Sequence, residues 1–201
     1  MPGDSSRIDI CGGIASGKTT LCSLIKQGGW PVIFENFQEN PFWLSFYKDP
    51  TDYAFETEVT FLLQHYSQIK SGFKDHGRIA CDFAPLQDYA YAKVNLTGGR
   101  LEAFCAVYQQ VISELSAPSL IVHLECSAKE ELKRIQCRAR SEERGVRLEY
   151  LDALNRAIAG DVRAASLATR VLVIDSEIND FACDPVAQAR VLEMVLDAVG
   201  R

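Results

Sequence analysis

The sequence lacks the long apolar run that a membrane-spanning helix needs, and its first residues, Met1–Ser6, contain neither the basic nor the apolar segment of a secretion signal. Positive charge is also scarce, because 21 lysines and arginines are outnumbered by 27 aspartates and glutamates and the formal net charge is −6. Binding to a nucleic-acid backbone needs clustered cations. We therefore expect a cytoplasmic protein with no membrane partner and no nucleic-acid partner.

Cysteines paired at C-x-x-C spacing are absent, although the chain has seven cysteines. Several lie in apolar segments, which favours buried free thiols in a reducing compartment. The hydrophobic content of 47% and the charged content of 24% are ordinary for a globular protein. A chain of 201 residues is then expected to form one domain, residues 1–201, with a substantial core.

A glycine-rich loop near the N-terminus matches the phosphate-binding pattern G-x-x-x-x-G-K-[ST] without a mismatch. An apolar, strand-like run precedes it and a helical pattern follows it, which is the context that this loop requires. The loop's backbone N–H groups can surround phosphates, the lysine can reach the β- and γ-phosphates, and the threonine hydroxyl can bind Mg²⁺. We expect ATP to bind here, through Gly12, Gly13, Ile14, Ala15, Ser16, Gly17, Lys18, Thr19 and Thr20.

Short apolar runs alternate with longer periodic segments along the chain, which predicts a parallel sheet covered by helices on both faces. The expected fold is a three-layer α/β/α arrangement of the P-loop NTPase type with a five-stranded parallel sheet. We predict strands at residues 7–11, 30–34, 78–83, 120–125 and 170–174. We predict helices at residues 19–26, 53–73, 101–116, 129–140, 148–159 and 185–199. Ligands gather beyond the carboxyl ends of such strands.

Charged residues at these strand ends suit phosphoryl transfer. Glu35 follows the second strand and could take a proton from an acceptor hydroxyl, although it could also be a helix cap or a surface residue. Asp82 ends the third strand, where an acid could hold Mg²⁺ together with Thr19. Planar guanidinium groups suit phosphate oxygens, so Arg134, Arg138 and Arg140 could bind the phosphates of ATP. Alternatively, these arginines belong to the solvated face of a charged helix.

A further series of motifs occurs in order along the chain. They include Glu35 followed by residues 40–42 (Asn-Pro-Phe), 46–50, 53–55, 61–64, 81–83, 92–96, 134–143 and 149–151, and finally 173–175 with 180–181. With the phosphate loop, this series resembles the deoxynucleoside kinases, in particular the bacterial branch that acts on deoxyadenosine, deoxyguanosine or deoxycytidine. The resemblance extends from about Ile8 to about Asp184.

The resemblance implies ATP-dependent phosphorylation of a nucleoside 5′-hydroxyl, with Mg²⁺ as cofactor. By the same resemblance, Glu35 is the general base, Asp82 lies near Mg²⁺, and Tyr47 and Glu143 hold the sugar 3′-hydroxyl. Lys18 and the three arginines contact ATP, and residues 138–147 form a lid that closes over it. The family also implies a homodimer paired through long helices, here residues 53–73 and 101–116.

Three positions depart from the family. Glu58 stands where the family usually has the glutamine that recognises the base, His65 stands where an arginine is common, and Phe83 follows Asp82 in place of an arginine. An ionised carboxylate only accepts hydrogen bonds, so Glu58 fits guanine, which presents two adjacent donors, N1–H and N2–H₂. Alternatively, Glu58 lies on the helix surface and reads nothing. His65 or Asp88 could complete the contacts to the base.

The two missing arginines leave little charge for an acceptor phosphate, which favours a neutral nucleoside over a nucleotide as acceptor. The leading interpretation is therefore a kinase of the 5′-hydroxyl of a purine deoxynucleoside with a guanine-like edge. One alternative is a kinase of a modified nucleoside or of a hydroxymethyl group on a base. Another is a nucleotide-binding regulator that has lost catalysis, which the presence of Lys18, Thr19 and Glu35 disfavours.

Overall fold

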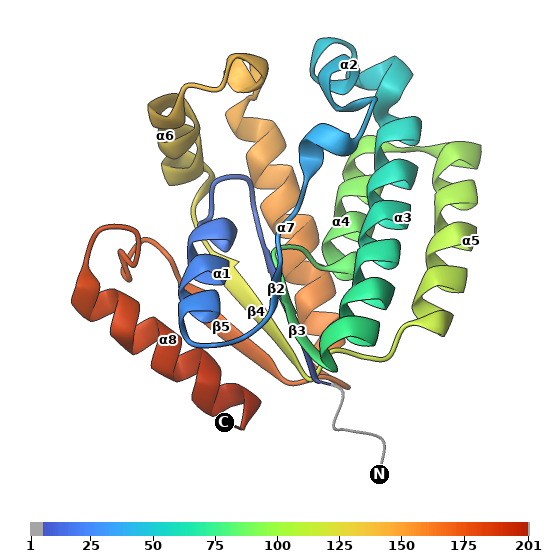
Figure 1. Cartoon of the computed structure of the whole chain (residues 1–201). Coiled ribbons are helices and arrows are strands. Elements are labelled where there is room, and N and C mark those ends of the chain that lie inside the picture. The colour runs from blue at the N-terminus through green and yellow to red at the C-terminus, as the bar shows by residue number, and fades with distance from the viewer. Residues whose placement is uncertain (1–5, 201) are drawn as a thin grey trace.

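A computed structural model describes residues 6–200 and contains one five-stranded sheet, in the order β2-β3-β1-β4-β5. All neighbouring strands are parallel, so the expected sheet is confirmed (Figure 1). The central strand is buried on both faces: Ile8, Ile10 and Cys11 are apolar, and the buried Asp9 between them is paired with Arg7. The strands are β1 (Ser6–Gly12), β2 (Val32–Ile33), β3 (Arg78–Cys81), β4 (Leu120–Glu125) and β5 (Val171–Asp175).

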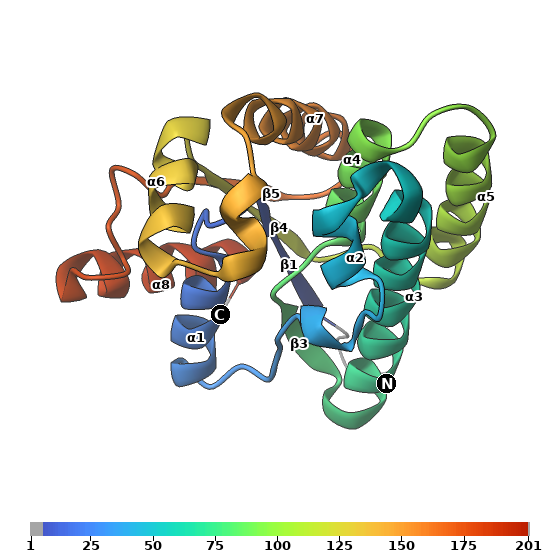
Figure 2. The ribbon, with the colours of Figure 1, turned by 90° about the horizontal axis from the view of Figure 1, so that it is seen from above.

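Helices cover both faces of this sheet. They are α1 (Lys18–Gln27), α2 (Trp43–Lys48), α3 (Pro50–His76), α4 (Pro85–Asn95), α5 (Gly98–Glu114), α6 (Ala128–Arg138), α7 (Leu148–Ala165) and α8 (Pro185–Val199), with 3₁₀ turns η1 (Phe37–Glu39) and η2 (Ser141–Gly145). Helices α1 and α8 pack on one face, and α3, α4 and α7 on the other (Figure 2). Helix α5 packs against α3 and α4 and lies farther from the sheet.

Two apolar clusters hold the layers together. One lies between the sheet and helices α1 and α8, where Ile10, Leu21 and Val191 are fully buried. The other joins α2, α3, α4 and α5 around Leu62 and Phe104. The second cluster packs α2, α3, α4 and α5 against one another, and α3 also buries the polar residues Thr57, Glu58 and His65.

Two helices were not predicted from the sequence. No helix is predicted between the third strand and residue 101, where α4 lies, and α2 is not predicted at all. Helix α4 packs against β1, α3, α5 and α7, so it has little polar face and its buried residues include both Gln87 and Ala90. A helix buried on several sides lacks the apolar stripe that reveals an amphipathic helix.

Several predicted boundaries were also wrong. The second strand consists of Val32 and Ile33 alone, and the third ends at Cys81, so Asp82 lies just beyond it. Helix α6 ends at Arg138 because Ala139 takes the left-handed conformation with φ 52°. Arg140 therefore lies outside the helix, in the turn that leads into η2.

All cysteines are free, and three of them (Cys11, Cys22 and Cys81) are buried. The expectation of buried thiols holds for these three, whereas Cys137 and Cys183 are exposed. Within residues 6–200, no helix combines the length and the apolar character needed to cross a membrane.

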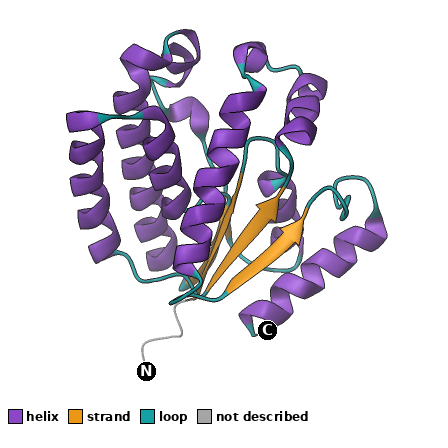
Figure 3. Ribbon diagram, turned by 180° about the vertical axis from the view of Figure 1, so that it is seen from behind, coloured by secondary structure: helices purple, strands orange, loops and turns teal. Residues whose placement is uncertain are grey.

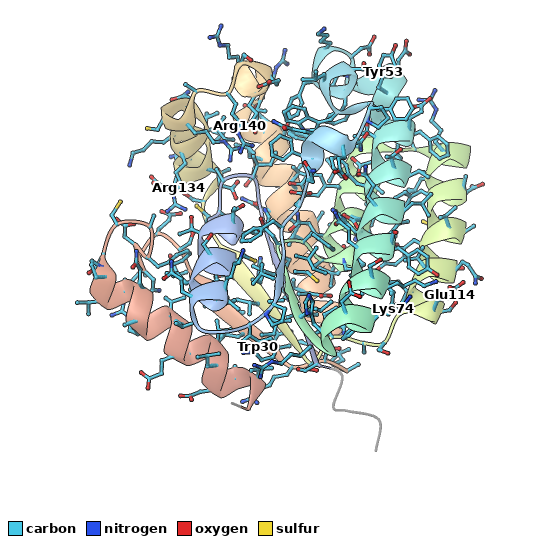
Figure 4. All side chains as sticks on the ribbon, in the orientation of Figure 1. Trp30, Tyr53, Lys74, Glu114, Arg134 and Arg140 are labelled. Atoms are coloured by element: carbon cyan, nitrogen blue, oxygen red, sulfur yellow. The ribbon has the colours of Figure 1, made fainter. Side chains whose placement is uncertain are left out.

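The strands all point toward the same end of the molecule (Figure 3). The phosphate loop, Glu35 and Asp82 follow β1, β2 and β3, so they emerge side by side at this end. Figure 4 places Arg134 and Arg140 at the same end, while Trp30 and Lys74 lie toward the opposite one.

Candidate active site

The phosphate loop connects β1 to the N-terminus of α1 through backbone that only glycine adopts easily. Gly17 caps α1 in the left-handed region with φ 106°. At Gly13, a Cβ atom would lie 1.9 Å from Oε1 of Glu131, so no side chain fits there. The N–H groups at this helix start face the end of the sheet, which gives a concave anion-binding surface.

Lys18, Thr19 and Asp82 form the polar centre of this surface. The Lys18 ammonium donates to the carbonyls of Gly12 and Gly13, each at 2.9 Å. The Thr19 hydroxyl donates to Oδ2 of Asp82 at 2.8 Å, while Oδ1 of Asp82 is buried without a hydrogen-bond partner. Burial raises the pKa of Asp82 to about 6, although Lys18 and Thr19 act in the opposite direction.

This pair of oxygen donors fits a magnesium ion. Mg²⁺ in nucleotide sites is held by one or two protein oxygens together with phosphate and water. A buried carboxylate oxygen without a partner beside a threonine hydroxyl supplies such a ligand set. Thr19 and Asp82 are therefore the residues that could hold the ion, as the sequence suggested.

Arg134 lies against the phosphate loop. Its Nη1 donates to the carbonyls of Ala15 and Ser16 at 3.4 and 3.5 Å, and its Nη2 donates to the carbonyl of Ser176 at 2.8 Å. Its Nε donates to Glu130 one helical turn earlier. The predicted ATP-binding arginine is thus fixed to the loop backbone, in reach of any anion that the loop holds.

Arg138 and Arg140 share one buried carboxylate. Arg138 donates to Glu143 through Nε at 2.7 Å and Nη2 at 2.6 Å, a bidentate pair, and Arg140 reaches the same carboxylate at 3.5 Å. The Glu143 side chain is only 3% exposed, and Arg140 also lies over the ring of Phe37. The expected sugar-binding acid and two expected ATP-binding arginines therefore form one cluster between the end of α6 and η2.

A cavity of about 450 Å³ connects these groups. This volume is in the range of small-molecule sites. Glu35, Tyr47 and Glu58 line it opposite the phosphate loop, and Tyr47 lies near Glu143, which together with burial raises the pKa of its hydroxyl. Aromatic rings form much of the remaining wall: Phe34, Phe37, Trp43, Phe46, Phe61, Tyr91 and Tyr150.

Glu58 lies inside this cavity and not on the helix surface. It is 4% exposed, and Asn95 donates to its Oε1 at 2.7 Å and to the hydroxyl of Tyr150 at 3.1 Å. Burial, with the charges of Asp88 and Glu35, raises the pKa of Glu58 to about 8, against the opposing effects of Asn95 and His65. A protonated carboxyl offers one donor and one acceptor, whereas the ionised form only accepts, so the hydrogen bonds that Glu58 can make depend on its protonation.

His65 lies behind the cavity wall, between two carboxylates. Its Nδ1 is 2.9 Å from Oδ2 of Asp88, and its Nε2 is 3.5 Å from Oε1 of Glu35. Burial alone would lower its pKa, but these two carboxylates raise the pKa of His65 to about 10. His65 is not among the described residues that line the cavity, unlike Asp88, so direct contact between its side chain and a base is not favoured.

Sequence reasoning assigned no role to several residues that the structure brings to the site. Asn95 donates to Glu58 and to the hydroxyl of Tyr150, and Gln87 accepts a hydrogen bond from the N–H of Gly12 at 2.9 Å. Asn95 and Tyr150 fall inside motifs that resemble the family, and the density of aromatic residues between 34 and 61 was a signal for the cavity wall. No sequence motif or composition pattern indicated a role for Gln87.

Comparison with known proteins agrees with this geometry. The sequence profile of the deoxynucleoside kinases matches residues 8–199. The chain belongs to the deoxynucleoside kinase family. This confirms the resemblance drawn from the motifs, and it makes the protein a member of a family of phosphotransferases.

Relatives of this kinase differ in the base that their names give. A deoxyguanosine kinase of Bacillus subtilis is 28% identical over 182 residues, covering 87% of this chain and 88% of that protein. A deoxyadenosine kinase of Dictyostelium discoideum is 32% identical over 160 residues, covering 77% of this chain and 65% of that protein. The chain thus spans a little less than two thirds of the length of this second relative.

A solved structure confirms the fold of the kinase. The structure of a deoxyadenosine kinase from M. mycoides, with dCMP and dCDP bound, superimposes with a TM-score of 0.82 at 25% identity. The match covers 96% of this chain and 99% of that one. Because the relatives include kinases of deoxyguanosine, deoxyadenosine and deoxycytidine, family membership alone does not fix the base.

Proposed function

We propose that this kinase transfers the γ-phosphoryl group of ATP to the 5′-hydroxyl of a deoxynucleoside, yielding ADP and the 5′-monophosphate. The observation that carries the proposal is the shared cavity, which the phosphate loop, Glu35 and Glu58 line together. A triphosphate on the loop and a base at Glu58 would place the sugar between them, beside Glu35. Residues 138–147 serve as the lid over ATP.

In this mechanism, Glu35 removes the proton of the 5′-hydroxyl as that oxygen attacks phosphorus. Burial by itself would raise the pKa of Glu35, but the nearby positive charge of His65, with Lys18 and Arg140, lowers it below the ordinary value. Glu35 is therefore ionised at neutral pH and ready to act as a base. Lys18 and Arg138 stabilise the charge that develops on the transferred group, and Tyr47 and Glu143 orient the sugar through its 3′-hydroxyl.

Magnesium, when bound at Thr19 and Asp82, supplies positive charge that neutralises the phosphate oxygens. The acceptor is a neutral nucleoside, because His65, the cation beside Glu35 on α3, is already paired with Asp88 and Glu35. The charge of His65 is therefore already neutralised by these two carboxylates and does not favour binding of an acceptor phosphate.

For the base, a guanine-like edge remains the first proposal. Guanine N1–H and N2–H₂ can both donate to an ionised Glu58, and hydrogen bonds to the charged form would favour ionisation when the base binds. The raised pKa of Glu58 favours a second candidate. A protonated Glu58 has one donor and one acceptor, which suits adenine or cytosine, each with a ring nitrogen acceptor beside an amino group.

Replacing Glu35 with Gln tests the catalytic proposal. Glu35→Gln should lower kcat by at least about a hundredfold, since a general base contributes that much or more, while ATP still raises the melting temperature. Glu39→Gln, which changes an exposed glutamate in η1, is the matched control and should keep full activity. Measuring ADP release with natural, modified and hydroxymethylated nucleosides would identify the acceptor. Full turnover by Glu35→Gln would contradict the mechanism.

A further inference from the structure

Glu35, the proposed general base, lies in a short connection between two elements and not within a helix or a strand. Glu35 follows a strand of two residues and precedes the 3₁₀ turn that starts at Phe37. Its side chain is 29% exposed at the cavity. A flexible carboxylate loses orientation toward a substrate hydroxyl, so its position depends on contacts from more rigid elements.

His65 provides such a contact from the middle of α3, a helix of 27 residues. Its ring stacks on Phe83 with centroids 3.9 Å apart and planes 8° from parallel, and Phe61 lies on it at 5.8 Å and 27°. The ring is buried, and Phe83 is almost completely buried as well. Two aromatic neighbours thus fix the plane of the imidazole and, with it, the directions of its two nitrogens.

The two nitrogens point to different carboxylates. Nδ1 lies 3.0 and 2.9 Å from the two oxygens of Asp88 on α4, and Nε2 lies 3.5 Å from Glu35. When both nitrogens carry protons, the ring is a cation held between two anions. Nδ1 then donates to Asp88, whereas Nε2 makes an ion-pair contact with Glu35 and has no hydrogen-bond partner of its own. Other charged groups near Glu35 are Lys18 and Arg140, which add to the effect of His65, and Asp82 and Glu58, which oppose it.

Two roles are possible for this chain of three residues. A proton relay requires a neutral imidazole that accepts the proton collected by Glu35. The raised pKa of His65 argues against a relay, because the ring already holds both protons at neutral pH. A permanent cation can instead orient Glu35 and stabilise its ionised form before the reaction.

We propose that His65 is a positioning residue that holds Glu35 ionised and directed at the acceptor hydroxyl, while Asp88 and the Phe83 ring hold His65. The proposal rests on Glu35 being the general base. It also accounts for the two positions where His65 and Phe83 replace the arginines common in the family. The His65 cation, stacked on the Phe83 ring, supplies the positive charge that those arginines would otherwise provide. No proton is transferred to His65, so the proton from the hydroxyl stays on Glu35 until it leaves for solvent.

The test compares the pH dependence of kcat and of nucleoside KM in the full-length protein. His65→Gln should lower kcat by about ten- to a hundredfold, change KM less, and move the acidic limb of the kcat profile to higher pH. His65→Arg should recover most of kcat and keep the limb near its wild-type position, because a guanidinium stacks on aromatic rings and stays charged. His76→Gln, at the exposed end of the same helix, is the matched control.

The variant Asp88→Asn tests the contact between Asp88 and His65 independently. Without the carboxylate, His65 loses its proton more easily, so kcat should fall toward alkaline pH in a range where the wild-type profile is flat. An unshifted acidic limb in His65→Gln, or equal loss in His65→Arg and His65→Gln, would overturn the proposal. If Glu35→Gln is inactive in the same assays, such a result removes only the role of His65; if Glu35→Gln is active, the proposed base itself is wrong.

Discussion

Glu58 presents a different hydrogen-bonding edge to a nucleobase in each protonation state. Asn95 donates to Oε1, so a proton on the carboxyl lies on Oε2, where it can be donated to a ring nitrogen. Below a pKa of about 8 the protonated edge matches adenine or cytosine, and above it the ionised edge matches guanine. The ratio of kcat/KM for deoxyguanosine to that for deoxyadenosine should therefore rise by up to about tenfold per pH unit. Steady-state kinetics with both nucleosides from pH 6 to 9 would measure it.

Glu58→Gln is the control for this prediction. Glutamine has the same shape as a protonated glutamate and does not titrate, so the ratio should become independent of pH and favour deoxyadenosine. Asp88 and His65 also carry charge near the base, and both are unchanged in this variant. A pH-dependent ratio that persists in Glu58→Gln would assign the effect to one of them.

Gly13 is a phosphate-loop position where an added side chain would collide with two neighbouring side chains, Glu131 and Asn155. In Gly13→Ala the new methyl group would overlap the buried carboxyl of Glu131 and the amide oxygen of Asn155, so these side chains or the loop must shift. Overpacking of this kind costs about 1–3 kcal/mol, which corresponds to about a five- to hundredfold loss of ATP affinity if the loop takes the strain. Titration calorimetry with ATP would measure the loss. Gly160→Ala, where a methyl group meets no atom within 4 Å, should bind ATP normally.

At the scale of elements, the turn η2 joins the nucleotide side of the site to the sugar side. Its Glu143 receives a bidentate pair from Arg138 at the end of α6, and two parallel hydrogen bonds fix the guanidinium plane. Arg138→Lys keeps the charge but cannot form this pair. We expect kcat to fall by about ten- to a hundredfold with little change in melting temperature.

Arg144→Lys is the comparison for the lid, because Arg144 lies in the same turn and is exposed. It should leave kcat within about twofold of the wild-type value, as surface substitutions usually have small effects. Equal losses in the two variants would mean that the turn needs arginine for its fold and not for contact with ATP. Stopped-flow or coupled assays at saturating ATP would separate kcat from ATP affinity.

Some elements were predictable because one physical signal dominates them. The phosphate loop follows from glycine spacing, β1 from the apolar, β-prone residues Ile8, Ile10 and Cys11 just before that loop, and α8 from an amphipathic pattern that matches Pro185–Val199 to the residue. Helix α4 was not, because neighbours on several sides remove its polar face. The pairing of Glu35 with His65 could not be predicted from the sequence either, because the two residues come from different segments and only the packing of α3 beside β2 brings them together.

At the scale of the whole molecule, α3 links the active site to the outer surface. Its inner face carries Glu58 and His65, while Leu63 on the same helix is 45% exposed. Helix α5 lies beside it, with Tyr66 of α3 hydrogen-bonded to Glu114 of α5 and Ile112 39% exposed nearby in the chain. Two adjacent helices with exposed apolar side chains form a suitable surface for a second copy of the chain.

We therefore expect the kinase to form a homodimer through α3 and α5. Light scattering coupled to size-exclusion chromatography should give twice the mass of the chain for the wild type, and the mass of a single chain for Leu63→Asp combined with Ile112→Asp. A charge at the centre of an apolar contact loses its hydration on association, which opposes dimerisation.

Leu167→Asp is the control. It alters a leucine that is 89% exposed in the segment between α7 and β5, and it should leave the dimer intact. A wild-type protein that is monomeric at micromolar concentration would contradict this arrangement. Because α3 also carries Glu58 and His65, the monomeric variant should show a higher nucleoside KM if the partner chain keeps this helix in place.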